Sequence, residues 1–155
     1  MTDPYTCETN AYKRLKQEGV CEAGITPMFY GHAEIHPHDH RPHLDAFSDN
    51  SWPPYAILLE YIPHLANLDY KTYTPERTKQ FISGMDMIQG VGVMHGDVNS
   101  RNMMVAVEGE REKIVYVGFD RAQTYEVGRF PERQRGWMED EKRVLGDVLR
   151  GMVCS

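Results

Sequence analysis

Met94–Val105 reads M-H-G-D-V-N-S-R-N-M-M-V and carries the most specific pattern of the chain. Within it, Asp97 is followed five residues later by Asn102, and an apolar run comes directly after the asparagine. A loop fixed at both ends can direct a carboxylate and a carboxamide into one cleft, and this spacing is short enough to do so. The pattern therefore predicts a loop with a paired acid and amide, followed by a strand.

A second stretch, Val115–Ala122, reads V-Y-V-G-F-D-R-A. Together the two stretches resemble the protein-kinase and aminoglycoside-phosphotransferase superfamily, whose catalytic loop reads H-[RG]-D-x-x-x-x-N and leads into a strand. The resemblance implies that Asp97 accepts the proton of an acceptor hydroxyl, and that Asn102 helps to hold a magnesium ion on the phosphates of ATP. His95 and Arg101, the other functional groups of the loop, complete the expected catalytic residues.

The second stretch departs from the superfamily at one position. The superfamily has D-F-[GD], and its first aspartate is the main magnesium ligand, whereas this chain has Gly118, Phe119 and Asp120. Glycine cannot coordinate a metal through a side chain, and Asp120 would need a shifted backbone to reach the same ion. The resemblance implies magnesium and ATP as cofactors, with Asn102 and Asp120 as the remaining candidate ligands. Gly118 argues against conventional phosphoryl transfer.

The expected fold is α+β, a truncated protein-kinase-like fold that forms a single domain over residues 1–155. Its parts are a small-lobe helix and strands, a long central helix, the catalytic loop with its hairpin, and a closing helix. Because no lysine precedes Glu8, the Gly-rich loop and the lysine strand of the superfamily are expected to be absent. Glu8 stands where the superfamily's helix glutamate pairs with that lysine, but a solvated carboxylate favoured by the helix dipole is the preferred interpretation.

Three segments show the apolar period of amphipathic helices. Cys7–Gly19 has an apolar face, and its terminal glycine favours a stop. Thr74 and Pro75 form a helix start with a capping hydroxyl and a proline in the first turn, and this helix is predicted to run to Gly90. Its apolar residues are expected on one face: Phe81, Ile82, Met85 and Ile88. The last helix is predicted over Glu139–Val153, with a stripe interpreted as core packing: Val144, Leu145, Val148, Leu149 and Met152.

Four strands are predicted from apolar or alternating runs: Pro27–Ile35, Tyr55–Tyr61, Met103–Val107 and Lys113–Val117. The last two are expected to pair as a hairpin across residues 108–110. The near-continuous apolar run of the second strand predicts that both of its faces are covered. The resemblance places Glu60 and Ile62 where the superfamily contacts adenine, and a simple core strand is an equally compatible interpretation.

Four histidines and an aspartate gather within eight residues: His36, His38, Asp39, His40 and His43. Imidazoles so close together can bind zinc or copper. Pro37 and Pro42 break the segment, and the spacing does not indicate a preorganised tetrahedron. The preferred interpretation is therefore an exposed loop between two strands.

Three arginines and a tryptophan gather in a segment predicted as a loop: Arg129, Arg133, Arg135 and Trp137. Such a cluster can hold phosphates or stack a base, so RNA is a candidate partner. A solvated loop, with salt bridges to the many carboxylates of the chain, is the preferred alternative.

Composition and charge limit the classes of protein. The 155 residues suffice for one domain with a core, and 41% hydrophobic with 26% charged residues is ordinary for a globular chain. The formal net charge of -6 argues against a protein whose whole surface binds nucleic acid or anionic membranes. Three cysteines without a recognisable framework favour a reducing compartment, and no apolar run reaches the ~18 residues of a membrane span. A cytoplasmic protein without membrane contact is therefore expected.

Three functions stay open. The first is a transferase in which Asp97 activates a hydroxyl or amine acceptor, with phosphoryl transfer to a small molecule or a protein. The second is a pseudokinase, a binding module without catalysis. The third is an acyl or aminoacyl transferase that does not use ATP, for example in aminoacyl-tRNA-dependent peptide or cyclodipeptide formation. An activated ester needs a positioned base but no phosphate machinery. The acceptor of either transferase is a small molecule or a peptide.

Overall fold

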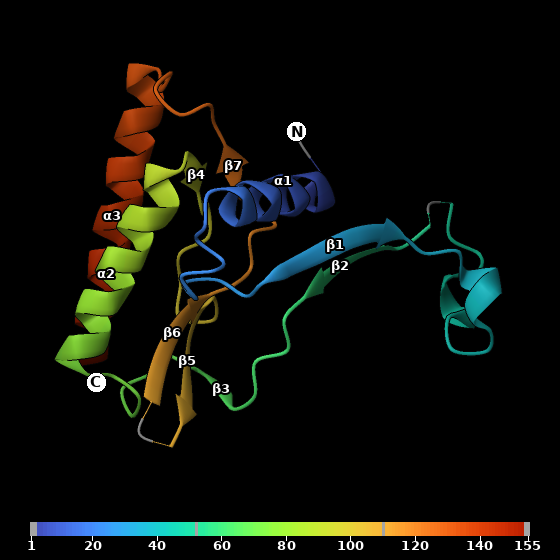
Figure 1. Cartoon of the computed structure of the whole chain (residues 1–155), viewed down its shortest axis with the longest axis horizontal. Coiled ribbons are helices and arrows are strands. Elements are labelled where there is room, and N and C mark those ends of the chain that lie inside the picture. The colour runs from blue at the N-terminus through green and yellow to red at the C-terminus, as the bar shows by residue number, and fades with distance from the viewer. Residues whose placement is uncertain (1–2, 52, 110, 154–155) are drawn as a thin grey trace.

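The computed structural model describes residues 3–51, 53–109 and 111–153. Its fold is α+β, as predicted, with helices and small antiparallel sheets (Figure 1). The helices are α1 (Pro4–Gln17), α2 (Pro75–Gly90) and α3 (Glu132–Val153). The strands are β1 (Phe29–Glu34), β2 (Tyr55–Leu59), β3 (Leu65–Asn67), β4 (Val93–Met94), β5 (Met103–Glu108), β6 (Arg111–Tyr116) and β7 (Gln123–Thr124). None of the helices in the described part of the chain is long and apolar enough to cross a membrane.

β5 and β6 form the predicted hairpin, although residue 110 of its turn lies outside the described residues. Met103 lies opposite Tyr116 in the antiparallel register, so the residues just outside the strands are also neighbours. The N–H of Val117 donates to the carbonyl oxygen of Asn102 at 3.0 Å. The two motif stretches are apart in the sequence, and the hairpin brings them side by side.

Three short strands complete the sheets. β3 pairs with the other edge of β5, and β4 pairs with β7. No sequence pattern predicts these strands, because runs of two or three residues are too short to show an alternation. The β4–β7 pair places the residues that precede the loop of Asp97 and Asn102 beside those that follow Asp120.

α1 packs its apolar face into the core. The carboxylate of Asp3 caps the helix by accepting the N–H of Thr6 at 3.2 Å, and Pro4 occupies the first turn. The helix therefore begins three residues before the predicted start at Cys7, because its first turn is marked by the cap and the proline and not by the apolar period. Its core side chains are completely buried: Ala11, Tyr12 and Leu15.

α2 confirms the predicted helix start, since the N–H of Arg77 donates to the hydroxyl of Thr74 at 3.1 Å. Phe81, Met85 and Ile88 are fully buried. The prediction was wrong for Ile82, whose side chain is 45% exposed. Successive helical residues are about 100° apart around the axis, so Ile82 is turned away from the face that its neighbours share.

α3 begins at Glu132, seven residues before the predicted start. The carbonyl oxygen of Pro131 accepts the N–H of Gln134 at 2.9 Å and so makes the first bond of the helix. The residues predicted as a loop are therefore partly helical: Arg133, Arg135 and Trp137. Charged residues and Gly136 hide the helical period in these first turns. Leu145 and Leu149 are buried as predicted, but Val144 is 45% exposed.

β2 corrects a further prediction. Its apolar run indicated a strand covered on both faces, yet Tyr55 is 48% exposed and Leu58 is 50% exposed. β1 and β2 form a two-stranded hairpin that extends away from α2 and α3 (Figure 1), and α1 covers only part of it. The connection between β1 and β2 lies at the far end of this hairpin. It contains the four histidines and two 3-10 turns, Pro37–His40 and Asp45–Phe47.

Candidate functional site

The carboxylate of Asp97 and the carboxamide of Asn102 are in direct contact. The Nδ2 of Asn102 donates to the Oδ2 of Asp97 at 3.0 Å and to its carbonyl oxygen at 2.9 Å. The backbone of Asn102 is fixed as well, because its N–H donates to the carbonyl oxygen of Asn99 at 3.0 Å. The five-residue spacing thus produces the closed loop and the paired side chains that the sequence predicted.

The middle of the loop is held by two further amides. Asn99 donates from Nδ2 to the carbonyl oxygen of Asp97 at 3.1 Å, and its Oδ1 accepts the N–H of Arg101 at 2.9 Å. Asn67, on β3, donates to the carbonyl oxygens of Ser100 and Arg101, both at 3.2 Å. The side chain of Arg101 is exposed, and its Nε also contacts the Oδ1 of Asn99 at 3.3 Å. The loop therefore holds Arg101 at the surface, beside Asn99.

His95 is completely buried. Its Nε2 lies 2.9 Å from the carbonyl oxygen of Val117, and its Nδ1 lies 3.3 Å from the N–H of Asp97. A carbonyl needs a donor and an N–H needs an acceptor, so these partners assign the neutral tautomer with the proton on Nε2. Burial lowers the pKa of His95, against smaller opposing effects of Glu141, Val117, Asp97 and Asp120. His95 positions the loop, because substrate cannot reach a side chain without exposed surface.

Glu141 on α3 is the residue of the site that sequence reasoning missed. Its Oε1 accepts the N–H of Gly96 at 2.7 Å, and its Oε2 accepts the N–H of His95 at 3.2 Å. The Nε2 of Gln89, on α2, donates to the same Oε2 at 2.9 Å. Glu141 is only 8% exposed. A buried carboxylate with three donors thus fixes the start of the loop to two helices.

A stack of buried aromatic rings, here called the aromatic stack, connects the loop to α1 and β1. The ring of His95 lies 4.5 Å from that of Phe119, which lies 5.2 Å from Tyr12, which lies 5.9 Å from Phe29. All four are at most 5% exposed. Aromatic contacts of this kind stabilise by about 0.5–1.5 kcal/mol each beyond burial. The position of the first helix is therefore linked to that of the loop.

Gly118 lies against Asn102 with a backbone φ of +75°. A Cβ at this position would lie 2.7 Å from the Cγ of Asn102 and even closer to its Oδ1. The amide of Asn102 thus occupies the space into which a side chain at position 118 would extend. The described residues do not fit the magnesium site that the resemblance implies. The position of its main ligand is occupied by Gly118, which has no side chain and no room for one.

Asp120, the other candidate metal ligand, is exposed. It lines an open cleft of about 1060 Å³ between the first turns of α1 and residues 120–125, a cleft that neither Asp97 nor Asn102 lines. Within the described residues, no group of three or more His, Cys, Asp or Glu side chains is placed to hold a metal ion.

The preferred interpretation of Glu8 as a solvated carboxylate was wrong. Glu8 is half-buried on α1. Burial raises its pKa and the negative charge of Asp120 raises it further, whereas a hydrogen bond with the backbone of Phe119 lowers it. Glu8 therefore lies beside the G-F-D segment, which helix position alone does not reveal.

In the described part of the chain, Glu60, Ile62 and the histidines of residues 36–43 are not in contact with the loop, whereas Trp137 lines a pocket together with Gly96 and Val98 of the loop. The Oε2 of Glu60 accepts the N–H of Met28 at 3.1 Å and so closes the end of the β1–β2 hairpin, while Ile62 is half-buried just beyond. The histidines of residues 36–43 are exposed. Arg129 pairs with Glu126 at 3.8 Å, and Arg133 lies 4.9 Å above the ring of Trp137.

Gly118→Asp, which restores the superfamily's residue, is expected to destabilise the protein without creating a metal site. A positive φ and overlap with Asn102 together predict a loss of about 2–4 kcal/mol. Thermal unfolding measures the loss, and a magnesium-dependent ATP hydrolysis assay is expected to show no gain. Gly128→Asp is the matched control, because Gly128 has a φ of +85° but no atom near the Cβ position. Equal melting temperatures for the two variants, or a gain in hydrolysis for Gly118→Asp, would contradict the overlap.

No family model matches the chain, and no curated protein matches it. A solved structure of WaaP in complex with acyl carrier protein is similar to it, with a TM-score of 0.51 and 16% sequence identity. The match covers 96% of this chain and 71% of that chain. The likeness agrees with a truncated kinase-like α+β fold for this chain. At this identity, the similarity concerns the fold alone.

Proposed function

We propose that this chain is a transferase on a kinase-like scaffold, with Asp97 as the general base. The contact between Asp97 and Asn102, on a loop held by Glu141, carries the proposal. The Oδ2 of Asp97 accepts from Asn102, whereas no group among the described residues donates to its Oδ1. One oxygen of a half-buried carboxylate thus stays available for an acceptor while the other fixes its direction.

The proposed reaction needs only groups that the loop supplies. The hydroxyl or amine of the acceptor donates its proton to the Oδ1 of Asp97. Its oxygen or nitrogen then forms a bond to the electrophilic atom of the donor, and the leaving group departs with the electron pair of its own bond. Arg101 lies exposed on the same loop, and we assign it the stabilisation of negative charge on the donor or leaving group.

Gly118 favours an acyl or aminoacyl ester as the donor over ATP. A phosphoryl donor requires cations on its phosphates, and position 118 offers no ligand. An activated ester carries no such charge. Phosphoryl transfer stays the second candidate, supported by the kinase-like fold. A peptide or protein acceptor agrees with either donor, since WaaP, which shares the fold, is solved in complex with acyl carrier protein. RNA contact through Arg129, Arg133 and Arg135 belongs to the proposal only for an aminoacyl-tRNA donor.

Untargeted mass spectrometry of small molecules and peptides tests the proposal. Extracts of cells that express the wild type are compared with extracts of cells that express Asp97→Ala, and Asp39→Ala serves as the control because Asp39 is an exposed carboxylate far from the loop. We expect a product that the wild type and the control make and Asp97→Ala does not. Its mass increment identifies the transferred group as phosphoryl or acyl. Identical profiles for all three proteins would contradict the transferase and favour a binding module.

A further inference from the structure

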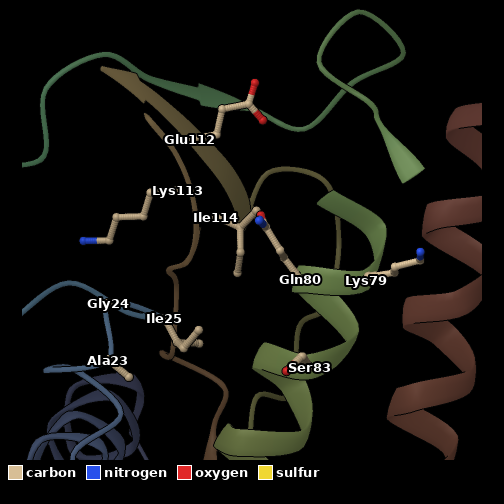
Figure 2. A pocket seen from close by; sticks show the side chains of 9 residues that line it. All are labelled: Ala23, Gly24, Ile25, Lys79, Gln80, Ser83, Glu112, Lys113 and Ile114. Carbon is tan, nitrogen blue, oxygen red and sulfur yellow. The ribbon is translucent and has the colours of Figure 1, made fainter. Parts of the chain in front are cut away.

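A cavity of about 420 Å³ lies where three segments meet: residues 23–25, α2 and β6 (Figure 2). None of its lining residues belongs to the catalytic loop or to the G-F-D segment. Ligand cavities in proteins typically measure about 300–1,000 Å³. The cavity is therefore large enough for a small molecule, and the proposed transferase reaction makes no use of it.

The cavity carries an excess of positive charge. Glu112 is the one acidic residue that lines it, and its carboxylate binds the buried Arg77 through contacts of 2.8 and 3.0 Å. Lys79 and Lys113 also line the cavity, and neither has a carboxylate partner among the described residues. The ion pair compensates Glu112, which leaves two uncompensated cations on a chain of net charge -6.

Gly24 determines where one of these lysines lies. Its φ is +77°, and a Cβ at this position would lie 2.9 Å from the Cε of Lys113. Glycine therefore allows the stem of Lys113 to pass directly over the backbone of residues 23–25. In Figure 2, the ammonium of Lys113 stands above Gly24, whereas Lys79 extends toward α3. The stem of Lys79 has rotatable bonds that allow it to turn toward a bound anion.

The rest of the cavity is part apolar and part neutral polar. Ile25 and Ile114 approach each other over Gly84, where a Cβ would lie 3.1 Å from the Cγ2 of Ile25 and 3.4 Å from the Cδ1 of Ile114. Ser83 and Gln80 line the α2 side and form no side-chain hydrogen bond among the described residues. The cavity thus combines an apolar floor with free donors.

We propose that this cavity binds a small organic phosphate whose apolar part is about the size of one aromatic ring. The ring rests on Ile25 and Ile114, and the phosphate accepts hydrogen bonds from Lys113, Ser83 and Gln80. A 150 Å³ cavity already holds benzene, so the volume admits a ring together with a phosphate. Charge-assisted hydrogen bonds are roughly twice as strong as neutral ones, so the phosphate contributes selectivity against uncharged analogues.

Phenyl phosphate is the probe, with phenol and inorganic phosphate as its two halves. We expect phenyl phosphate to shift the backbone amide resonances of Gly24, Ser83 and Ile114 in a ¹H–¹⁵N titration. Each half alone is expected to bind at least about tenfold more weakly, because it loses either the charge or the apolar contact. Benzoate forms a further arm. Equal binding of benzoate would show a general anion site and overturn the assignment to a phosphate.

The double variant Lys79→Gln/Lys113→Gln tests the cations. We expect its affinity for phenyl phosphate to fall by about 10- to 100-fold, since hydrogen bonds to charged groups dominate such sites. Lys13→Gln/Lys16→Gln is the matched control, because it changes the net charge equally through two exposed lysines of α1. Both variants replace side chains outside the core. The melting temperature of each variant is measured to verify that it is folded. An equal loss in both variants, an unchanged affinity in the first, or no resonance shift at about 10 mM phenyl phosphate would overturn the proposal.

Discussion

Asp97→Asn is expected to reduce the proposed transferase activity strongly while leaving the fold intact. Asparagine has the shape of aspartate and its Oδ1 can still accept from the Nδ2 of Asn102, but it cannot take a proton. General bases contribute about 10²–10⁴-fold to rates, so activity should fall by this factor. The rate of product formation is measured on purified protein, with the product found by mass spectrometry, and the melting temperature is measured on the same preparation.

Asp39→Asn is the matched control for this variant, since it makes the same chemical change at an exposed aspartate of the β1–β2 connection. It should retain both activity and melting temperature. A structural carboxylate at position 97 would behave differently. The melting temperature of Asp97→Asn would fall while activity per folded molecule persisted, and Asp97 would then not carry the chemistry.

Glu141→Gln is expected to produce a large loss of stability. The buried carboxylate accepts from Gly96, His95 and Gln89, and hydrogen bonds to charged groups are worth about 1.5–3 kcal/mol each. Glutamine offers one acceptor oxygen and turns an NH₂ group toward the remaining donors. We expect the free energy of unfolding to fall by about 3 kcal/mol, and the melting temperature by about 6–12 °C for a chain of this size.

The activity of Glu141→Gln should also fall per folded molecule, because the start of the loop loses its attachment to α3. Glu139→Gln makes the same change two residues earlier on the exposed side of the helix. Its melting temperature should differ from that of the wild type by less than about 1 °C, since surface substitutions rarely matter. If the two variants melted alike, Glu141 would have no part in holding the loop.

The local part of the site could be predicted from the sequence, because its contacts join residues close together in the chain. Asp97 and Asn102 are five positions apart, so their spacing alone restricts how the loop can close. The contacts of Glu141 with Gly96 and His95 join residues 45 and 46 positions apart. The sequence held one sign of the role of Glu141. This residue lies one helical turn before Leu145 and two turns before Leu149, and so on the apolar face of its helix. A carboxylate on a buried face requires donors.

The predictions of the fold were wrong where tertiary packing determines which residues are covered. The apolar run of β2 indicated two covered faces, but the number of elements that pack on a strand does not follow from its own residues. The start of α3 was predicted too late for a different reason. Arg133, Arg135 and Trp137 look like a surface loop in the sequence, whereas the helix places them on its exposed first turns.

The aromatic stack has a consequence for how the protein opens. Tyr12 and Phe29 come from the start of the chain, yet their neighbours Phe119 and His95 come from its second half. The chain loses conformational entropy when these distant segments come together, and this loss occurs in a single step, when the stack forms. Detaching α1 would expose the ring of Phe119 and, behind it, His95. α1 and the catalytic loop therefore belong to one cooperative unit, whose amide protons exchange with solvent through a common opening.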